Sequence, residues 1–121
     1  MSDPSVDLSV YCQSNTEDEA IYLFPDDFFA FQGHFPSHPI LPGFITIGVV
    51  EHALGLMTKK SIRLDLVKKA KFKKSILPND VVLVKIISQK WDRDRMTARI
   101  HVSTDGDLAA DLSLSLLNSL V

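Results

Sequence analysis

The stretch FQGHFPSHPILPGFITIGVVEH, residues 31–52, joins a proline-rich loop to a long apolar segment. Proline recurs at every third position, at Pro36, Pro39 and Pro42. Proline fixes φ and reduces the entropy that a loop loses on ordering, so this spacing predicts a stiff loop. Residues 44–57 carry few polar side chains, which indicates a helix that is buried nearly all round. We therefore expect this helix to lie at the centre of the fold.

Most of the remaining sequence is typical of β-strands. It is rich in β-branched residues or alternates between apolar and polar side chains, and Asp105-Gly106 is a strong hairpin signal. The expected strands are residues 5–14, 20–24, 64–76, 81–89, 96–103 and 108–117. Together these elements predict one α+β domain over residues 1–121, with an antiparallel sheet of five to six strands packed around the helix.

The composition excludes several classes of protein. Apolar residues make up 45% of the chain, which favours a folded domain over disorder. No apolar run approaches the length of a membrane span, and residues 1–15 lack the Lys or Arg of a secretory signal. The single Cys12 suits a reducing compartment, so we expect a cytoplasmic protein. We expect no metal or redox cofactor, because no His/Cys cluster has ligand spacing and no glycine-rich phosphate loop is present.

The charged residues are distributed unevenly. Residues 1–58 contain eight acidic residues and no Lys or Arg, whereas eight of the 13 basic residues lie within residues 59–74. Such a patch attracts acidic partners such as a phosphorylated cofactor, an acidic protein or nucleic acid, although a solvated strand face explains it equally well. Nucleic acid is the weaker alternative, because Phe72 is the only aromatic residue in the patch and the net charge is −2.

The proline-rich loop also carries a candidate for acid–base chemistry. The pKa of histidine lies near neutrality, so His34 is suited to act as a general base or acid. Pro42-Gly43 then opens the helix, whose free N–H groups and positive dipole end can polarise a carbonyl oxygen. This arrangement suits removal of a proton α to a thioester carbonyl on an acyl chain. It suits hydrolysis less well, because no Ser or Cys nucleophile is present at an elbow.

The segment GHFPSHPILPGF, residues 33–44, closely resembles the signature GHFPxxPIxPGV of the β-hydroxyacyl-acyl carrier protein dehydratases of fatty-acid synthesis. AKFKKSILPND, residues 70–80, is similar to a later basic segment of the same family. The resemblance implies the hot-dog fold, in which a long helix is wrapped by an antiparallel sheet. It also implies dehydration of a (3R)-hydroxyacyl thioester to the trans-2-enoyl thioester.

The resemblance further implies roles for individual residues. His34 would act on the α-carbon proton and the Gly43 amide would bind the thioester carbonyl, with Glu51 and His52 as candidates for the acidic partner. The substrate would lie against Phe35, Pro42, Phe44 and Gly48.

The resemblance also implies partners. Sites of this family form at a dimer interface, which implies a homodimer or a higher assembly such as a trimer of dimers, or a heterodimer with a related hot-dog subunit. The substrate would arrive on the phosphopantetheine arm of an acidic acyl carrier protein. That carrier would dock on the basic patch at Lys69, Lys71, Lys73 and Lys74.

The sequence departs from the family pattern at one position. The family's acidic residue lies 14 positions after the histidine, where this chain has Gly48. Glu51 is one turn later, about 60° around a helix and roughly 4.5 Å along its axis, and its side chain would lean back over Gly48. Three hypotheses follow. In the first, Glu51 replaces the carboxylate that is missing at Gly48, and His52 hydrogen-bonds Glu51 or acts as the acid itself. In the second, a related subunit supplies the carboxylate. In the third, dehydration is lost and the chain is a thioesterase or a non-catalytic acyl-binding subunit.

Overall fold

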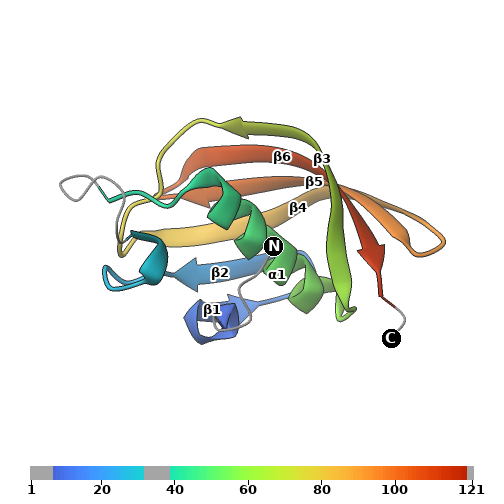
Figure 1. Cartoon of the computed structure of the whole chain (residues 1–121), viewed down its shortest axis with the longest axis horizontal. Coiled ribbons are helices and arrows are strands. Elements are labelled where there is room, and N and C mark those ends of the chain that lie inside the picture. The colour runs from blue at the N-terminus through green and yellow to red at the C-terminus, as the bar shows by residue number, and fades with distance from the viewer. Residues whose placement is uncertain (1–6, 32–38, 120–121) are drawn as a thin grey trace.

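The computed structural model describes residues 7–31 and 39–119. Within these residues the chain forms one α-helix, two short 3₁₀ helices and six strands (Figure 1). In chain order they are η1 (Leu8–Tyr11), β1 (Cys12–Asn15), β2 (Glu19–Leu23), η2 (Phe29–Phe31), α1 (Gly43–Thr58), β3 (Ile62–Phe72), β4 (Val81–Asp92), β5 (Arg95–Thr104) and β6 (Asp107–Asn118).

The six strands of the described residues form one antiparallel sheet in the order β1-β2-β4-β5-β6-β3. The sheet curves round α1, which lies against one of its faces (Figure 1). This arrangement confirms the expected α+β architecture. It also leaves β3 at one edge of the sheet, close to α1.

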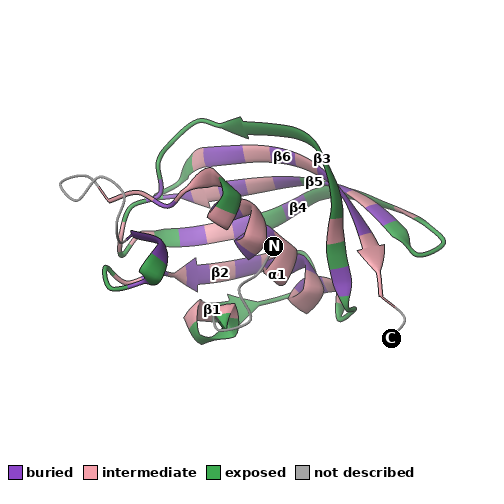
Figure 2. Ribbon diagram, in the orientation of Figure 1, coloured by how far each residue is buried: buried purple, intermediate pink, exposed green. Residues whose placement is uncertain are grey.

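The long strands follow the alternation expected from the sequence. Along β5, Met96, Ala98, Ile100 and Val102 are buried and alternate with more exposed residues, as Figure 2 shows. The turn into β6 has φ values of 52° at Asp105 and 79° at Gly106. Both φ values are positive, as the tight hairpin turn favoured by an Asp-Gly pair requires, so the hairpin prediction is confirmed.

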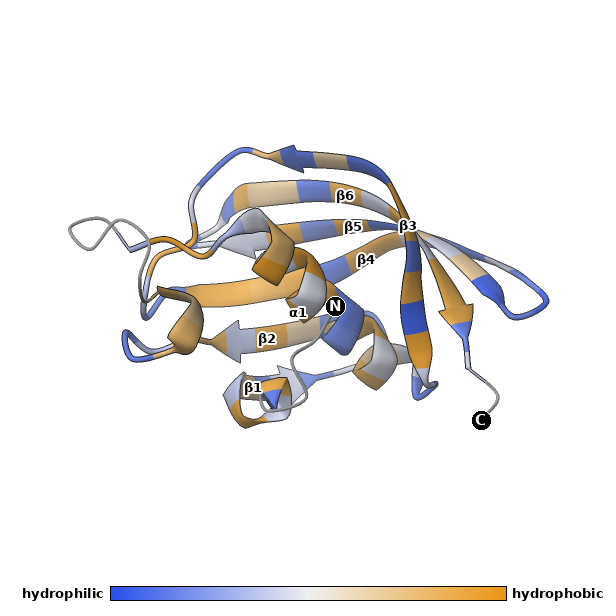
Figure 3. Ribbon diagram, viewed as in Figure 1, coloured by the Kyte–Doolittle hydropathy of each residue, from blue (hydrophilic) through white to orange (hydrophobic). Residues whose placement is uncertain are grey.

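The helix is confirmed within one residue at each end, but it is covered on one side only. Val49, Val50, Ala53 and Leu54 are buried against the sheet. On the other side the helix is half-buried, and Phe44 is 56% exposed. The expectation of a helix buried nearly all round is therefore wrong for the single chain, because one sheet covers only one helix face. Figure 3 shows α1 mostly in hydrophobic and near-neutral colours, with one hydrophilic stretch in its middle turns.

Several strand boundaries differ from the sequence-based expectation, and hydrogen bonds explain two of these differences. Residues 8–11 form the 3₁₀ helix η1 instead of strand, because the Asp7 carboxylate accepts a hydrogen bond from the Ser9 amide (3.0 Å) and caps it. The third strand, β3, ends at Phe72 instead of residue 76. There the amides of Lys73 and Lys74 both donate to the Ala109 carbonyl, at 2.7 and 3.2 Å, and the chain turns away.

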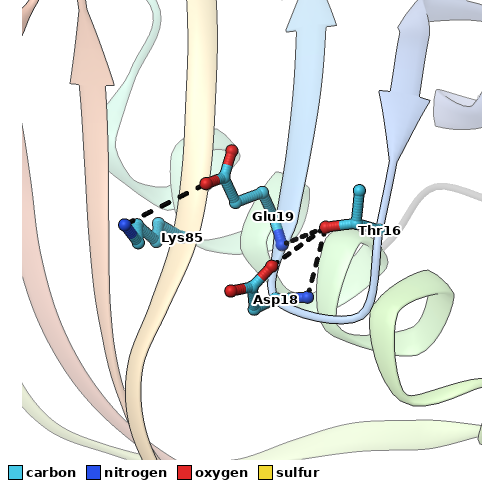
Figure 4. A network of polar contacts seen from close by, with 4 residues as sticks. All are labelled: Thr16, Asp18, Glu19 and Lys85. Carbon is cyan, nitrogen blue, oxygen red and sulfur yellow. Dashed lines mark hydrogen bonds and ion pairs between the residues drawn. The ribbon is translucent and has the colours of Figure 1, made fainter.

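A small polar network closes the turn between β1 and β2 (Figure 4). The Thr16 hydroxyl accepts hydrogen bonds from the amides of Asp18 (3.4 Å) and Glu19 (3.2 Å) and donates to the Asp18 carboxylate (3.0 Å). Glu19 then faces Lys85 on β4 at 4.0 Å. These exposed contacts fix the turn geometry more than they stabilise the fold.

In the two described ranges, no helix is both long enough and apolar enough to cross a membrane.

Candidate active site

The predicted site residues are divided between two regions of α1 and the loop before it. His34 and Phe35 lie outside the described residues, so the structure does not place them. Pro42, Gly43 and Phe44 form the start of α1, and Gly48, Glu51 and His52 lie along its middle turns.

The start of α1 is the turn at which the sequence predicts free amides. Pro42 is the N-cap in an extended conformation and makes no side-chain cap. Its carbonyl accepts the amides of Ile45 (3.0 Å) and Thr46 (3.1 Å), which closes the first turn. The amide of Gly43 precedes this turn, where helix N–H groups have no intrahelical acceptor.

The ring of Phe72, at the end of β3, lies directly over Gly43. A Cβ placed on Gly43 would be 3.0–3.3 Å from three atoms of this ring, so a larger residue would require the ring to shift by a few tenths of an ångström. Beside this contact is a pocket of about 390 Å³ between the start of α1 and the chain after β3. Its lining includes Thr46, Lys73 and Lys74.

A second pocket, of about 340 Å³, opens on the uncovered side of α1. Gly48, Glu51 and His52 line it together, as their helical spacing predicts. A Cβ on Gly48 would have no atom within 4 Å, so the space over this glycine is open. Asp7 lies at the pocket's other wall, with the chain that enters β3.

Glu51 connects the helix to the edge strand. One of its carboxylate oxygens, Oε2, accepts a hydrogen bond of 2.7 Å from the amide of Leu64 on β3. This contact fixes the position of the carboxylate beside the pocket. It leaves the second oxygen, Oε1, able to interact with a ligand.

His52 is held by a residue that the sequence analysis did not single out. The hydroxyl of Tyr22 on β2 lies 2.6 Å from His52 Nδ1, and the two rings meet edge to face. Burial lowers the pKa of the His52 imidazole, although the charge of Asp7 partly opposes this effect. The apolar strand AIYLF contained the signal for this contact, because a buried tyrosine hydroxyl needs a polar partner.

The four lysines predicted to dock a carrier protein lie on and just after β3. Lys69 and Lys71 are exposed on the strand, and Lys73 and Lys74 line the pocket beside Gly43. Lys74 also pairs with Asp107 at 2.9 Å, so one of the four charges is partly neutralised. The basic patch is therefore continuous with the pocket at the start of α1.

In the single chain, the Gly43 part and the Glu51 part of the predicted site do not meet. The pocket beside Gly43 and the pocket beside Glu51 share no lining residue among those described. Gly43 and Glu51 are also eight residues apart on one helix, which corresponds to roughly 12 Å along its axis. The described residues of one chain thus place the Gly43 amide and the Glu51 carboxylate beside two separate pockets.

Comparison with known proteins provides a family and a fold. The family model for ApeI-like proteins, described as ApeI dehydratase, matches residues 12–111. The 3-hydroxyacyl-[acyl-carrier-protein] dehydratase FabZ of Xanthomonas oryzae pv. oryzae (strain PXO99A) is 27% identical over 93 residues, which cover 69% of this chain and 61% of that protein. The match therefore spans about three fifths of the curated relative's length.

Solved structures share the fold at low identity. The dehydratase heterocomplex ApeI:P from Xenorhabdus doucetiae matches with a TM-score of 0.66 and 24% identity, covering 90% of this chain and 96% of that one. A thioesterase complexed with coenzyme A and Zn from Thermus thermophilus also matches with a TM-score of 0.66, at 14% identity, covering 84% and 83%. With these matches, the architecture of one helix and a curved antiparallel sheet is the expected hot-dog fold.

Proposed function

Because the chain belongs to the family of ApeI-like dehydratases, we propose that it takes part in the reversible dehydration of (3R)-hydroxyacyl thioesters. The substrate is carried on the phosphopantetheine arm of an acyl carrier protein, and the product is the trans-2-enoyl thioester. The observation that carries this proposal is the placement of Glu51 beside the open space over Gly48, one turn from the family's carboxylate position.

In the proposed reaction, His34 removes the proton from the α-carbon while the Gly43 amide binds the thioester carbonyl. The negative charge that develops on that oxygen is stabilised by the amide and by the positive end of the α1 dipole. The C–O bond to the β-hydroxyl then breaks, and the free oxygen of a protonated Glu51 donates the proton that completes the leaving water. Proton return from His34 to Glu51 through solvent closes the cycle.

The proposed site needs a second subunit. Its base and carbonyl-binding amide come from one chain, and its carboxylate comes from the helix of the other, since the pockets are separate within one chain. The uncovered side of α1 and the exposed side chains of Leu66 and Val67 on edge strand β3 provide apolar surface for such a partner. The partner is a second copy, alone or in a trimer of dimers, or a related hot-dog subunit in a heterodimer.

The cellular setting belongs to the same proposal. The reaction needs no metal or redox cofactor, since the acyl carrier supplies the phosphopantetheine. It takes place in the cytoplasm, and its macromolecular partner is an acidic protein rather than a nucleic acid.

A thioesterase is the second candidate, because a thioesterase complexed with coenzyme A shares the fold and Glu51 could activate a water. A non-catalytic acyl-binding subunit is the third, because a dehydratase with the same fold is a heterocomplex. A thioesterase would release free thiol from an acyl thioester, whereas a dehydratase would not. A non-catalytic subunit would bind acyl carrier protein, weakly at high salt, without turnover of its own.

The test of the proposal is hydration of a crotonyl or longer enoyl thioester by the purified protein. The reaction is monitored through the loss of the conjugated double bond. His34→Ala should abolish the reaction. His101→Ala is the matched control, because His101 lies on β5 near Asp111 and lines neither pocket, so this variant should keep its activity. Full activity of His34→Ala would contradict the assignment.

A further inference from the structure

Tyr22 and His52 form a hydrogen-bonded pair between the sheet and the helix. Tyr22 has no exposed surface, and its hydroxyl reaches from β2 to His52 Nδ1 at 2.6 Å. His52 is half-buried and forms part of the pocket wall with Gly48 and Glu51. The pair therefore connects a fully buried hydroxyl to a side chain at the surface of the candidate site.

The direction of this hydrogen bond follows from the burial of the tyrosine. Burial raises the pKa of the Tyr22 hydroxyl well above its usual range, so the hydroxyl keeps its proton. Within the described residues, His52 Nδ1 is the polar atom that this hydroxyl meets. If the hydroxyl only accepted a bond, its own proton would be buried without an acceptor, which is unfavourable. The hydroxyl therefore donates and Nδ1 accepts.

The direction of the bond determines where His52 carries its proton. A neutral imidazole has one N–H, so an accepting Nδ1 requires the proton to be on Nε2. The two ring nitrogens direct their bonds away from each other, so Nε2–H is directed away from the buried tyrosine. Glu51 lies beside His52 on the pocket wall, but its Oε2 is already bonded to the Leu64 amide.

We propose that Tyr22 is a positioning residue that holds His52 as the Nε2–H tautomer, giving the pocket a fixed, neutral hydrogen-bond donor for an oxygen of the acyl thioester. The tautomer is independent of the reaction, whereas the role toward substrate rests on the proposed function. A neutral imidazole would become an imidazolate if it gave up its proton, so His52 polarises the oxygen and the transferred proton comes from Glu51. His52 thus donates a hydrogen bond in this site, whereas Glu51 donates the transferred proton.

Nitrogen-15 NMR of the labelled protein tests the tautomer without any turnover. In the unmodified protein, His52 Nδ1 should have the chemical shift of an unprotonated ring nitrogen and Nε2 that of a protonated one. His52→Gln identifies the signals by removing them. In Tyr22→Phe both shifts should move toward each other as the two tautomers mix. Tyr11→Phe, in the same aromatic cluster, should leave them unchanged. A protonated Nδ1 in the unmodified protein, or unchanged shifts in Tyr22→Phe, would overturn the proposal.

Two substitutions of His52 test its role toward substrate. The amide nitrogen of glutamine can occupy the place of Nε2, whereas that of asparagine mimics Nδ1. We expect His52→Gln to keep most of the enoyl-thioester hydration rate and His52→Asn to lose about 10²-fold, the usual cost of a removed oxyanion donor. Equal rates for the two variants would overturn the donor role. Absence of turnover in the unmodified protein, both alone and together with a related hot-dog subunit, would instead reject the proposed function and leave the tautomer to the NMR result.

Discussion

Replacing Gly48 by alanine tests whether the space beside Glu51 is open. Alanine is favoured over glycine inside a helix by about 1 kcal/mol. Within the single chain the added Cβ would have no described atom within 4 Å, so no steric term inside the chain offsets this gain. We therefore expect Gly48→Ala to raise the free energy of unfolding by about 1 kcal/mol and the melting temperature by roughly 4 °C.

Two other glycines of α1 serve as matched controls in the same urea and thermal unfolding experiments. At Gly55 an added Cβ would meet the Lys60 carbonyl at 3.5 Å, an ordinary contact, so Gly55→Ala should stabilise by a similar amount. At Gly43 the Cβ would lie 3.0 Å from the Phe72 ring, which would have to move, so Gly43→Ala should be the least stable of the three. Destabilisation by Gly48→Ala equal to that by Gly43→Ala would refute the open space.

The remaining predictions concern pH, charge and a turn. The folded-state pKa of His52 is lowered, so the unfolded chain takes up its proton first, and the stability that this residue contributes should fall below about pH 6.5. His52→Gln should remove the part of this decrease in the free energy of unfolding that His52 causes. An unchanged pH dependence of stability in this variant would contradict the prediction. The double variant Lys69→Glu/Lys71→Glu should weaken acyl carrier protein binding about tenfold at low salt, measured by calorimetry, whereas Lys90→Glu on β4 should not. Gly106→Ala should lower the free energy of unfolding by about 1 kcal/mol, because φ is 79° at this position and alanine is strained there. An unchanged urea midpoint would contradict the turn geometry described at Gly106.

The sequence predicts the elements whose signals are local. The Asp105-Gly106 turn and the apolar run of α1 are confirmed because each depends on a few adjacent residues. The end of β3 depends on the distant Ala109 carbonyl, and no local pattern marks it. The first expected strand is wrong where Asp7 caps η1, since one side chain outweighs a weak alternation.

The candidate site divides in the same way. Helical spacing alone predicts that Gly48, Glu51 and His52 lie together, and the structure confirms this. The contacts that fix them come from other elements, from Tyr22 on β2 and from the Leu64 amide on β3. These contacts depend on how the sheet packs on the helix, which spacing within the helix does not determine.

The Leu64 amide also makes Glu51 a favourable position for a clean test. In Glu51→Gln the amide oxygen can still accept the bond from Leu64, so the fold should remain while the ability to give or take a proton is lost. A further variant, Glu51→Gln with Gly48→Glu, returns a carboxylate to the open space one turn earlier. It should recover part of the rate if the pocket needs a carboxylate rather than this particular residue.

The central claim is that Glu51 takes the place of the carboxylate missing at Gly48. The rate of enoyl-thioester hydration by the unmodified protein and by Glu51→Gln tests it most directly, with the melting temperatures of both proteins measured alongside. We predict that the substitution lowers the rate by about 10²-fold or more while the melting temperature changes little. An unchanged rate in a folded Glu51→Gln protein would contradict the claim.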